Sequence, residues 1–299
     1  MMRLQTNNKQ ILLLLNPVAG KGKGKERLFE IIDRLYSHGY QVTAIPTDID
    51  GKANLILQNE WHNYSKLVCV GGDGTLSGAV NAYIAGNCEI PMGYIPLGST
   101  NDFAATLGIS KKLLDACDRI AESEPKFIDV GKFNDRYFSY IACTGLLTEV
   151  SYMTSQQLKN MLGHNAYLLK GVFALKNAKK IRYTVKTDSE TIEGDYLFAS
   201  VSNTEKAGGV FKFPKGEIQL DDGYFELTLL KAPNGIYEMT TLINDLINGK
   251  VKGSSFVKRK VRHATIEINQ PRGWSLDGEN GGMTQSANIS VVENKLLFL

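Results

Sequence analysis

The sequence predicts two domains: a parallel-sheet α/β domain over residues 1–125, then an antiparallel β-sandwich over residues 126–299, whose last residues can return to the first domain. Short apolar runs alternate with helix-like segments in the first part, which is typical of a parallel sheet with helices on both faces. Beyond Glu124-Pro125, strand-like segments follow one another and turn residues separate many of them. A chain of 299 residues is long enough for two such domains.

The N-terminal elements follow from two hydrophobic periods. Short continuous apolar runs, such as Ile11–Leu15, are expected to be buried parallel strands. Apolar residues three or four positions apart, as in Lys25–His38, are expected to form helices with one buried face. The expected strands are 11–15, 40–45, 67–70 and 92–95, and the expected helices are 25–38, 52–59, 76–85, 102–107 and 111–122.

The C-terminal elements are mostly strands. Turn residues such as Asp221-Asp222-Gly223 separate them, which favours antiparallel neighbours. The expected strands are 128–133, 136–142, 181–187, 191–201, 224–230, 263–269 and 287–292. Two helices, near residues 155–179 and 236–248, are expected to interrupt this run.

The composition excludes several classes of protein. Hydrophobic residues at 43% and charged residues at 22% are typical of a globular chain, and a net charge of +3 is too small to indicate a nucleic-acid partner. The four cysteines contain no C-x-x-C pair, so neither a zinc site nor a disulfide framework is predicted, and reduced thiols in the cytoplasm are expected. No apolar stretch approaches the roughly 20 residues of a spanning helix. Any contact with lipid is therefore expected from the water side.

The first candidate motif is the glycine- and lysine-rich stretch from Asn16 to Lys25, between an expected strand and an expected helix. Glycines let a ligand approach the backbone, and the amides at a helix start suit phosphate. The spacing fits neither the P-loop nor the dinucleotide fingerprint. A flexible basic turn is the alternative interpretation.

Two more loops have the same position between a strand and a helix. Gly71-Gly72-Asp73-Gly74-Thr75 follows the third strand, and Pro96–Phe103 follows the fourth. Ligands of open α/β sheets bind at the carboxyl ends of the strands, so three such loops predict a nucleotide cleft. Thr75, and either Asn101 or Asp102, are also candidates to cap the helices that follow.

The C-terminal half contributes two acidic turns. Leu276-Asp277-Gly278-Glu279 offers carboxylates that can accept the proton of an attacking hydroxyl, although Asp-Gly is also a common hairpin turn. Gln219–Tyr224 includes two aspartates that suit magnesium, with a plain turn as the alternative.

The ordered set N-P-x-x-G, G-G-D-G-T, P-x-G-[ST]-x-N-D-F, D-D-G and D-G-E resembles the diacylglycerol kinase catalytic family, in its bacterial soluble branch, over nearly the whole chain. The resemblance implies the two-domain plan that this family shares with NAD kinases, with ATP bound between the domains. The implied nucleotide-binding set, taken together with the loops above, is Asn16, Pro17, Gly20, Lys21, Thr47, Gly71, Gly72, Asp73, Gly74, Thr75, Gly78, Ser99, Thr100, Asn101 and Asp102. Ser99 replaces the threonine usual in the family and keeps its hydroxyl.

The resemblance also implies the catalytic and metal-binding residues. The D-G-E segment supplies the catalytic base, which we place on Asp277, with Glu279 as its neighbour or a magnesium contact. An acidic water network maps to Asp73, Asp102 and Asp129, with Lys21 as its basic partner. A structural Mg²⁺ maps to Asp222 and the carbonyl groups of Gln219 and Tyr224.

The implied reaction is in-line transfer of the ATP γ-phosphate to a lipid hydroxyl, by default that of diacylglycerol, at the surface of a membrane. Phosphatidylglycerol and sphingoid bases stay open as acceptors. An NAD kinase and a non-catalytic nucleotide-binding protein are the competing hypotheses. Similar kinases often pair, so a homodimer is an expectation. Basic residues after the apolar run 167–175 suggest peripheral membrane contact, or else a helix packed on the sandwich.

Overall fold

The fold was analysed in a computed structural model of the chain. It describes residues 9–20, 22, 24–47, 52–145, 180–204, 206–207, 211–212, 218–247 and 255–299. The chain divides into two compact units. Unit 1 contains Met1–Val130 and Glu293–Leu299, and unit 2 contains Gly131–Val292. The expected helix at residues 155–179, with its candidate membrane contact, lies outside the described residues.

Unit 1 is built on a parallel sheet. Its strands are β1 (Gln10–Leu15), β2 (Gln41–Pro46), β3 (Lys66–Gly71) and β4 (Met92–Pro96). They lie in the order β4-β3-β1-β2, so that β1 has a neighbour on each side. The apolar side chains from Ile11 to Leu15 are at most 5% exposed, which agrees with a strand covered on both faces.

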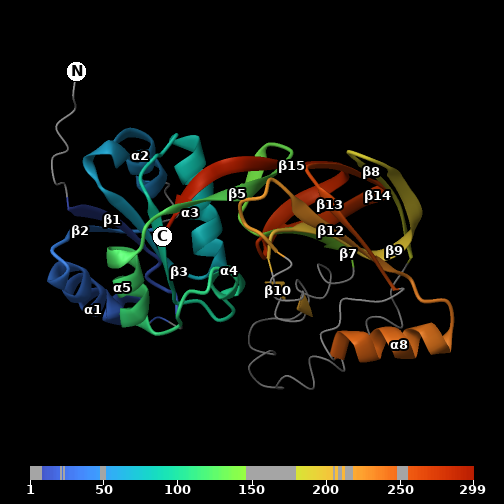
Figure 1. The fold of residues 1–299 in the computed structure, drawn as a ribbon, viewed down its shortest axis with the longest axis horizontal. Coiled ribbons are helices and arrows are strands. Elements are labelled where there is room, and N and C mark those ends of the chain that lie inside the picture. The colour runs from blue at the N-terminus through green and yellow to red at the C-terminus, as the bar shows by residue number, and fades with distance from the viewer. Residues whose placement is uncertain are drawn as a thin grey trace. The chain divides into compact units, whose positions relative to one another are not determined.

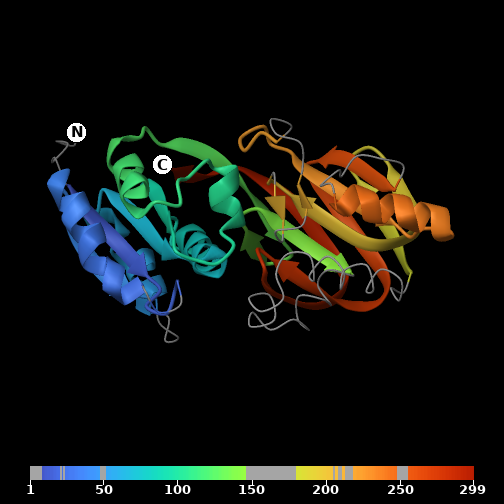
Figure 2. The same cartoon turned by 90° about the horizontal axis from the view of Figure 1, so that it is seen from below.

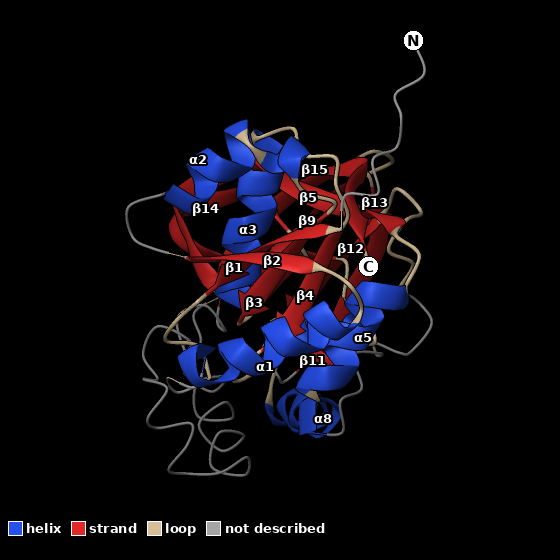
Figure 3. Cartoon of the chain, turned by 90° about the vertical axis from the view of Figure 1, so that its left-hand side faces the viewer, coloured by secondary structure: helices blue, strands red, loops and turns tan. Residues whose placement is uncertain are grey.

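Helices cover both faces of this sheet (Figure 3). Helices α2 and α3 lie on one face, and α1 and α5 lie on the other. The helices of unit 1 are α1 (Gly24–Ser37), α2 (Lys52–Asn59), η1 (Trp61–Asn63), α3 (Asp73–Ala85), α4 (Asp102–Thr106) and α5 (Leu113–Glu122). The C-terminus returns to this unit beside α5 (Figures 1 and 2), where Arg119 Nε donates a hydrogen bond of 3.3 Å to the Leu299 oxygen.

Unit 2 consists mainly of antiparallel strands, with β8 pairing with both β9 and β14 and the other main strands in the order β13-β12-β9-β7-β14-β15. The strands that belong to it wholly or in part are β5 (Lys126–Phe133), β6 (Arg136–Phe138), β7 (Ile141–Gly145), β8 (Ile181–Thr187), β9 (Thr191–Ser202), β10 (Lys206–Ala207), β11 (Phe211–Lys212), β12 (Phe225–Lys231), β13 (Phe256–Val261), β14 (His263–Leu276) and β15 (Glu279–Phe298). Its described helix is α8 (Ile236–Ile247). Strands β5 and β15 each run from one unit into the other.

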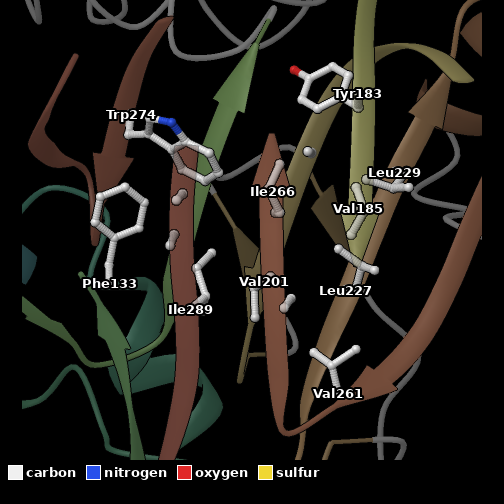
Figure 4. Close-up of a cluster of buried hydrophobic side chains, with 14 of the residues drawn as sticks. Phe133, Tyr183, Val185, Val201, Leu227, Leu229, Val261, Ile266, Trp274 and Ile289 are labelled. Atoms are coloured by element: carbon white, nitrogen blue, oxygen red, sulfur yellow. The ribbon is translucent and has the colours of Figure 1, made fainter. Parts of the chain in front are cut away.

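One face of the unit 2 strands forms a hydrophobic core (Figure 4). Trp274 is fully buried, and its ring lies against that of Phe133 with centroids 4.9 Å apart. Val201 and Leu227 pair across β9 and β12 and both point into this core. Alternate residues of these strands are therefore apolar and buried together, as period-two patterning requires.

One expectation about unit 2 was wrong, and one strand was not expected. Residues 136–142 were expected to be one strand, but the structure has two, β6 and β7, because the amides between them turn towards the side chain of Asp277. Strand β13, which lies at one end of the strand order, was not among the expected strands. Lys258 and Lys260 alternate there with Val257 and Val261, which pack on the core.

We predict that Gly131→Ala destabilises the protein, because a Cβ there would lie 2.0 Å from the ring of Phe138, which is fully buried. Overpacking of this kind typically costs about 1–3 kcal/mol of unfolding free energy. The control is Gly273→Ala, whose Cβ would meet only Met283 Sδ at 3.7 Å. Urea melts that show equal stability for both variants would contradict the packing described for unit 2.

Candidate nucleotide-binding loops and acidic turns

The order of strands in unit 1 creates a switch point between β1 and β3. The chain passes from β1 to β2 on one side and later returns to place β3 and β4 on the other. Ligands of open α/β sheets bind at such a point, outside the carboxyl ends of the strands. The loops that begin at Asn16 and at Gly72 follow β1 and β3, and so flank the switch point.

Side chains from the first two loops meet there. Asn16 Nδ2 donates a hydrogen bond of 3.0 Å to Thr75 Oγ1 at the start of α3, and Asn16 Oδ1 accepts one of 3.1 Å from the Val18 amide. Thr47, which follows β2, donates its amide to the Leu15 carbonyl at 2.7 Å. The structure thus brings the expected nucleotide residues Asn16, Thr47 and Thr75 to one edge of the sheet.

The second and third loops approach each other through two glycines. A Cβ on Gly98 would lie 2.5 Å from the Cα of Gly72, a distance that real side chains do not reach. The Leu97 amide also donates to the Gly71 carbonyl at 2.7 Å. Glycine at position 98 is therefore required by the backbone packing itself, whereas a Cβ on Gly72 would make a tight contact of 3.2 Å with the Cα of Gly98.

Asn101 closes the third loop on itself. Its side chain accepts a hydrogen bond from the Gly98 amide at 2.9 Å and donates one to the Gly98 carbonyl at 2.8 Å. Its backbone is left-handed, with φ of 52°, which asparagine tolerates better than most residues. Ser99 and Thr100, in the same loop, are exposed.

Tyr94 joins the second and third loops, and the sequence analysis missed it. Its hydroxyl lies 3.2 Å from the Gly71 carbonyl oxygen and 3.2 Å from Asn101 Oδ1, so it can donate to either loop. Burial, with the nearby Asp73 carboxylate, raises the pKa of this hydroxyl, which stays protonated. A tyrosine within an otherwise apolar buried strand was the signal, because a buried hydroxyl needs a polar partner.

Of the candidate helix caps, Asn101 does occupy the N-cap position of α4, but neither α3 nor α4 has a side-chain cap hydrogen bond from its N-cap residue. Gly72 is the N-cap residue of α3, and Thr75 lies inside the helix with its hydroxyl turned to Asn16. Asn101 is the N-cap residue of α4, but its side chain bonds Gly98 instead of the helix amides. The side chains that could have capped the helices hold the loops together instead.

The three acids expected in the water network all lie in unit 1. Asp73 begins α3, and Asp102 begins α4 with 6% of its surface exposed. Asp129 is almost fully buried and its Oδ1 accepts the Asn294 amide at 2.8 Å, so it fixes the returning C-terminal segment. Lys21 lies outside the described residues.

The D-G-E segment in unit 2 forms a tight hairpin turn between β14 and β15. Asp277 and Gly278 are its two central residues, with positive φ values of 54° and 89°, and Leu276 pairs with Glu279. Asp-Gly is the pair that this type of turn favours. The turn places two acids at the end of one hairpin. The segment can therefore be a hairpin turn and still supply a catalytic carboxylate.

The two acids of this turn have opposite surroundings. Asp277 is 1% exposed, and its carboxylate accepts backbone hydrogen bonds from Ser139 at 2.6 Å, Tyr140 at 2.9 Å and Ile141 at 3.1 Å. Several amide donors stabilise the ionised form of a carboxylate and reduce its tendency to take a proton. Glu279 is exposed to solvent.

The turn expected to bind magnesium already has a cation. Asp222 Oδ1 accepts the Tyr224 amide at 3.0 Å, and Asp222 Oδ2 accepts Lys260 Nζ at 2.7 Å. This contact with Asp222 raises the pKa of Lys260, so the lysine stays charged. Across the described ranges, no three acidic, histidine or cysteine side chains gather as a metal site. The turn as it stands, with Lys260 on its carboxylate, does not fit Mg²⁺.

The geometry of unit 1 suits a phosphate-bearing ligand. The first turn of a helix offers amide hydrogens without intrahelical partners, and α1, α3 and α4 all begin beside the loops described above. Among the helices of the described ranges, none is long and apolar enough to cross a membrane.

Comparisons with known proteins agree on one family. A profile of the diacylglycerol kinase catalytic domain matches residues 10–133. A diacylglycerol kinase of Staphylococcus aureus (strain bovine RF122 / ET3-1) is 32% identical over 276 residues, which are 92% of this chain and 87% of that protein. One of strain JH9 has the same identity and coverage.

Solved structures show the same fold. A putative diacylglycerol kinase from Bacillus anthracis str. Sterne superposes with a TM-score of 0.83 at 23% identity, covering 100% of this chain and 97% of that one. A second structure described in the same words gives 0.80 at 23% identity, covering 97% and 96%. With strands, loops and relatives in agreement, the chain belongs to the diacylglycerol kinase family.

Proposed function

We propose that this chain is an ATP-dependent lipid kinase that transfers the γ-phosphate of ATP to a lipid hydroxyl, with diacylglycerol as the acceptor and phosphatidic acid as the product. The observation that carries the proposal is the convergence of glycine-bearing loops from β1, β3 and β4 at the switch point of unit 1. The relatives named diacylglycerol kinase, which match 92% of the chain, support the choice of acceptor.

The loops account for nucleotide binding. The bare backbone at Gly72 and Gly98 lets phosphates approach closely, and the starts of α3 and α4 supply amides for their charge. Asn16 and Thr75 hold the first and second loops in register. Phosphoryl transfer depends mainly on such positioning and charge stabilisation, so this arrangement suits ATP, bound with the magnesium ion that normally accompanies it.

The surroundings of the D-G-E turn favour Glu279 over Asp277 as the base that accepts the proton of the lipid hydroxyl. A base must reach its substrate and gain a proton. The carboxylate of Asp277 is enclosed and holds three backbone amides, whereas Glu279 is open to solvent. Asp277 then acts as a positioning residue that fixes the turn.

The wider plan of the molecule is part of the same proposal. Unit 2 is the β-sandwich of the two-domain kinase plan, and the enzyme meets its acceptor at a membrane surface. The expected pairing of two copies stays a prediction.

The test of the proposed function is incubation of the purified chain with labelled ATP, magnesium and dioleoylglycerol in mixed micelles. Labelled phosphatidic acid is the expected product. Label on NAD and none on the lipid would instead make the chain an NAD kinase. Binding of ATP with no turnover of either acceptor would make it a nucleotide-binding protein.

We predict that Gly98→Ala weakens ATP binding by tenfold or more, because the added Cβ forces the second and third loops apart. A loss of about 1.4 kcal/mol corresponds to that factor. The control is Gly93→Ala on β4, whose Cβ would meet the Ile120 side chain at 2.6 Å, away from the loops. Calorimetry below both melting temperatures should show weaker ATP binding for Gly98→Ala alone. Equal affinities would contradict the proposed cleft.

We predict different defects for the two acids of the turn. Glu279→Gln should lower turnover about 100- to 10,000-fold and leave the melting temperature unchanged. Asp277→Asn should lower stability by about 1–3 kcal/mol, because an amide donor would face a backbone amide donor. Turnover and thermal melts measured on both variants separate the roles. An inactive but fully stable Asp277→Asn, beside a fully active Glu279→Gln, would return the role of base to Asp277.

A further inference from the structure

The second face of the unit 2 strands is unusually polar for a buried surface. Residues that pair across antiparallel strands point to the same face. Ser202 pairs with Glu226, and Ser200 pairs with Thr228, so these four side chains share the face opposite the core residues Val201 and Leu227. We call these four residues the polar rows.

The three hydroxyl groups of the polar rows are buried without partners, and Glu226 beside them is half-buried. Ser200 and Ser202 are fully buried, and Thr228 is 1% exposed. Within the described part of the chain, no hydrogen-bond partner reaches the hydroxyl oxygens of Ser200, Ser202 and Thr228 or Oε2 of Glu226. A buried polar group left unpaired typically costs about 1–3 kcal/mol, so four together indicate that something else satisfies them.

The polar rows continue into an apolar row along the strands. Phe198 on β9 pairs with Leu230 on β12, which in turn pairs with Phe256 on β13. All three are at most 8% exposed. One sheet face is therefore polar at one end and apolar at the other, as an amphiphilic ligand would require.

The polar end lies on the side of the D-G-E turn. Ser202 pairs with Ile141, whose amide donates to Asp277 Oδ1 at 3.1 Å. Phe198 pairs instead with Gly145, at the far end of β7. An amphiphile lying along these strands would thus have its polar end towards the acids of the turn.

Resting on the proposed function, we propose that the polar rows bind the ester carbonyl groups of a neutral acylglycerol acceptor, with its chains on the apolar row. The hydroxyl groups of Ser200, Ser202 and Thr228 are donors, and an ester carbonyl is an acceptor without a proton of its own. Glu226 shares this face with Lys260, its partner on β13, so the carboxyl has a cation beside it. Burial raises the pKa of Glu226 to about 7, so that it is partly protonated near neutral pH and accepts or donates to a glycerol oxygen.

The experiment compares two acceptors that differ only in their carbonyl groups. Dioleoylglycerol and 1,2-di-O-oleylglycerol, its ether analogue, compete for labelled ATP in the same mixed micelles. The natural chain should favour the ester by at least about fivefold in kcat/KM, since each hydrogen bond contributes roughly a 2- to 10-fold effect. The double variant Ser200→Ala/Thr228→Val should bring this ratio close to one, mainly through KM for the ester.

The matched control is a variant that removes an equally buried hydroxyl group outside the polar rows. Thr144→Val removes a hydroxyl that already donates to the Gly273 carbonyl at 2.8 Å, from a residue paired with the core residue Ala199. It should lower stability without changing the ester-to-ether ratio. A ratio near one in the natural chain, or a ratio that the double variant leaves unchanged, overturns the inference. Absence of any labelled lipid overturns the proposed function itself, and the inference with it.

Discussion

The close approach of two backbones, at Gly72 and Gly98, is the constraint on which unit 1 depends. A Cβ on Gly98 would lie 2.5 Å from Cα of Gly72, so the loops after β3 and β4 can pack in this way only if residue 98 lacks a side chain, and a Cβ on Gly72 would also be tight, at 3.2 Å from Cα of Gly98. The Tyr94 hydroxyl lies within hydrogen-bond distance of both of these loops. The Asn16 side chain forms a hydrogen bond that joins the second loop to the first. Three segments distant in sequence thus meet at one edge of the sheet. Phosphate recognition by backbone amides requires donors that stay in place, which such contacts favour.

A different device fixes the candidate catalytic turn in unit 2. The carboxylate of Asp277 accepts three successive backbone amides from residues 139–141, and this interrupts the strand that would otherwise run through them. The left-handed conformation of Asp277 and Gly278 completes the turn. Asp277 thus fixes the backbone of the turn, and its exposed neighbour Glu279 is the base that we propose. The spacing of the motif alone does not show that the two acids have different surroundings.

The parallel sheet of unit 1 was predictable from the sequence, since buried strands such as Ile11–Leu15 have a strong local signal and helix α2 has the expected bounds. The candidate nucleotide loops were predictable for the same reason, because each follows a strand. The break between β6 and β7 was not, because its cause lies 136–138 residues away in Asp277. Strand β13 was not predicted, because its lysines interrupt the apolar pattern to which Val257 and Val261 belong. The Lys260–Asp222 pair likewise depends on two distant strands meeting.

Hydrogen exchange measured with and without ATP tests the central claim most directly. If the loops of unit 1 form one nucleotide site, ATP must slow amide exchange together in peptides covering residues 16–20, 71–78 and 97–102. Protection confined to other parts of the chain, or to only one of these loops while ATP is bound, would contradict the account.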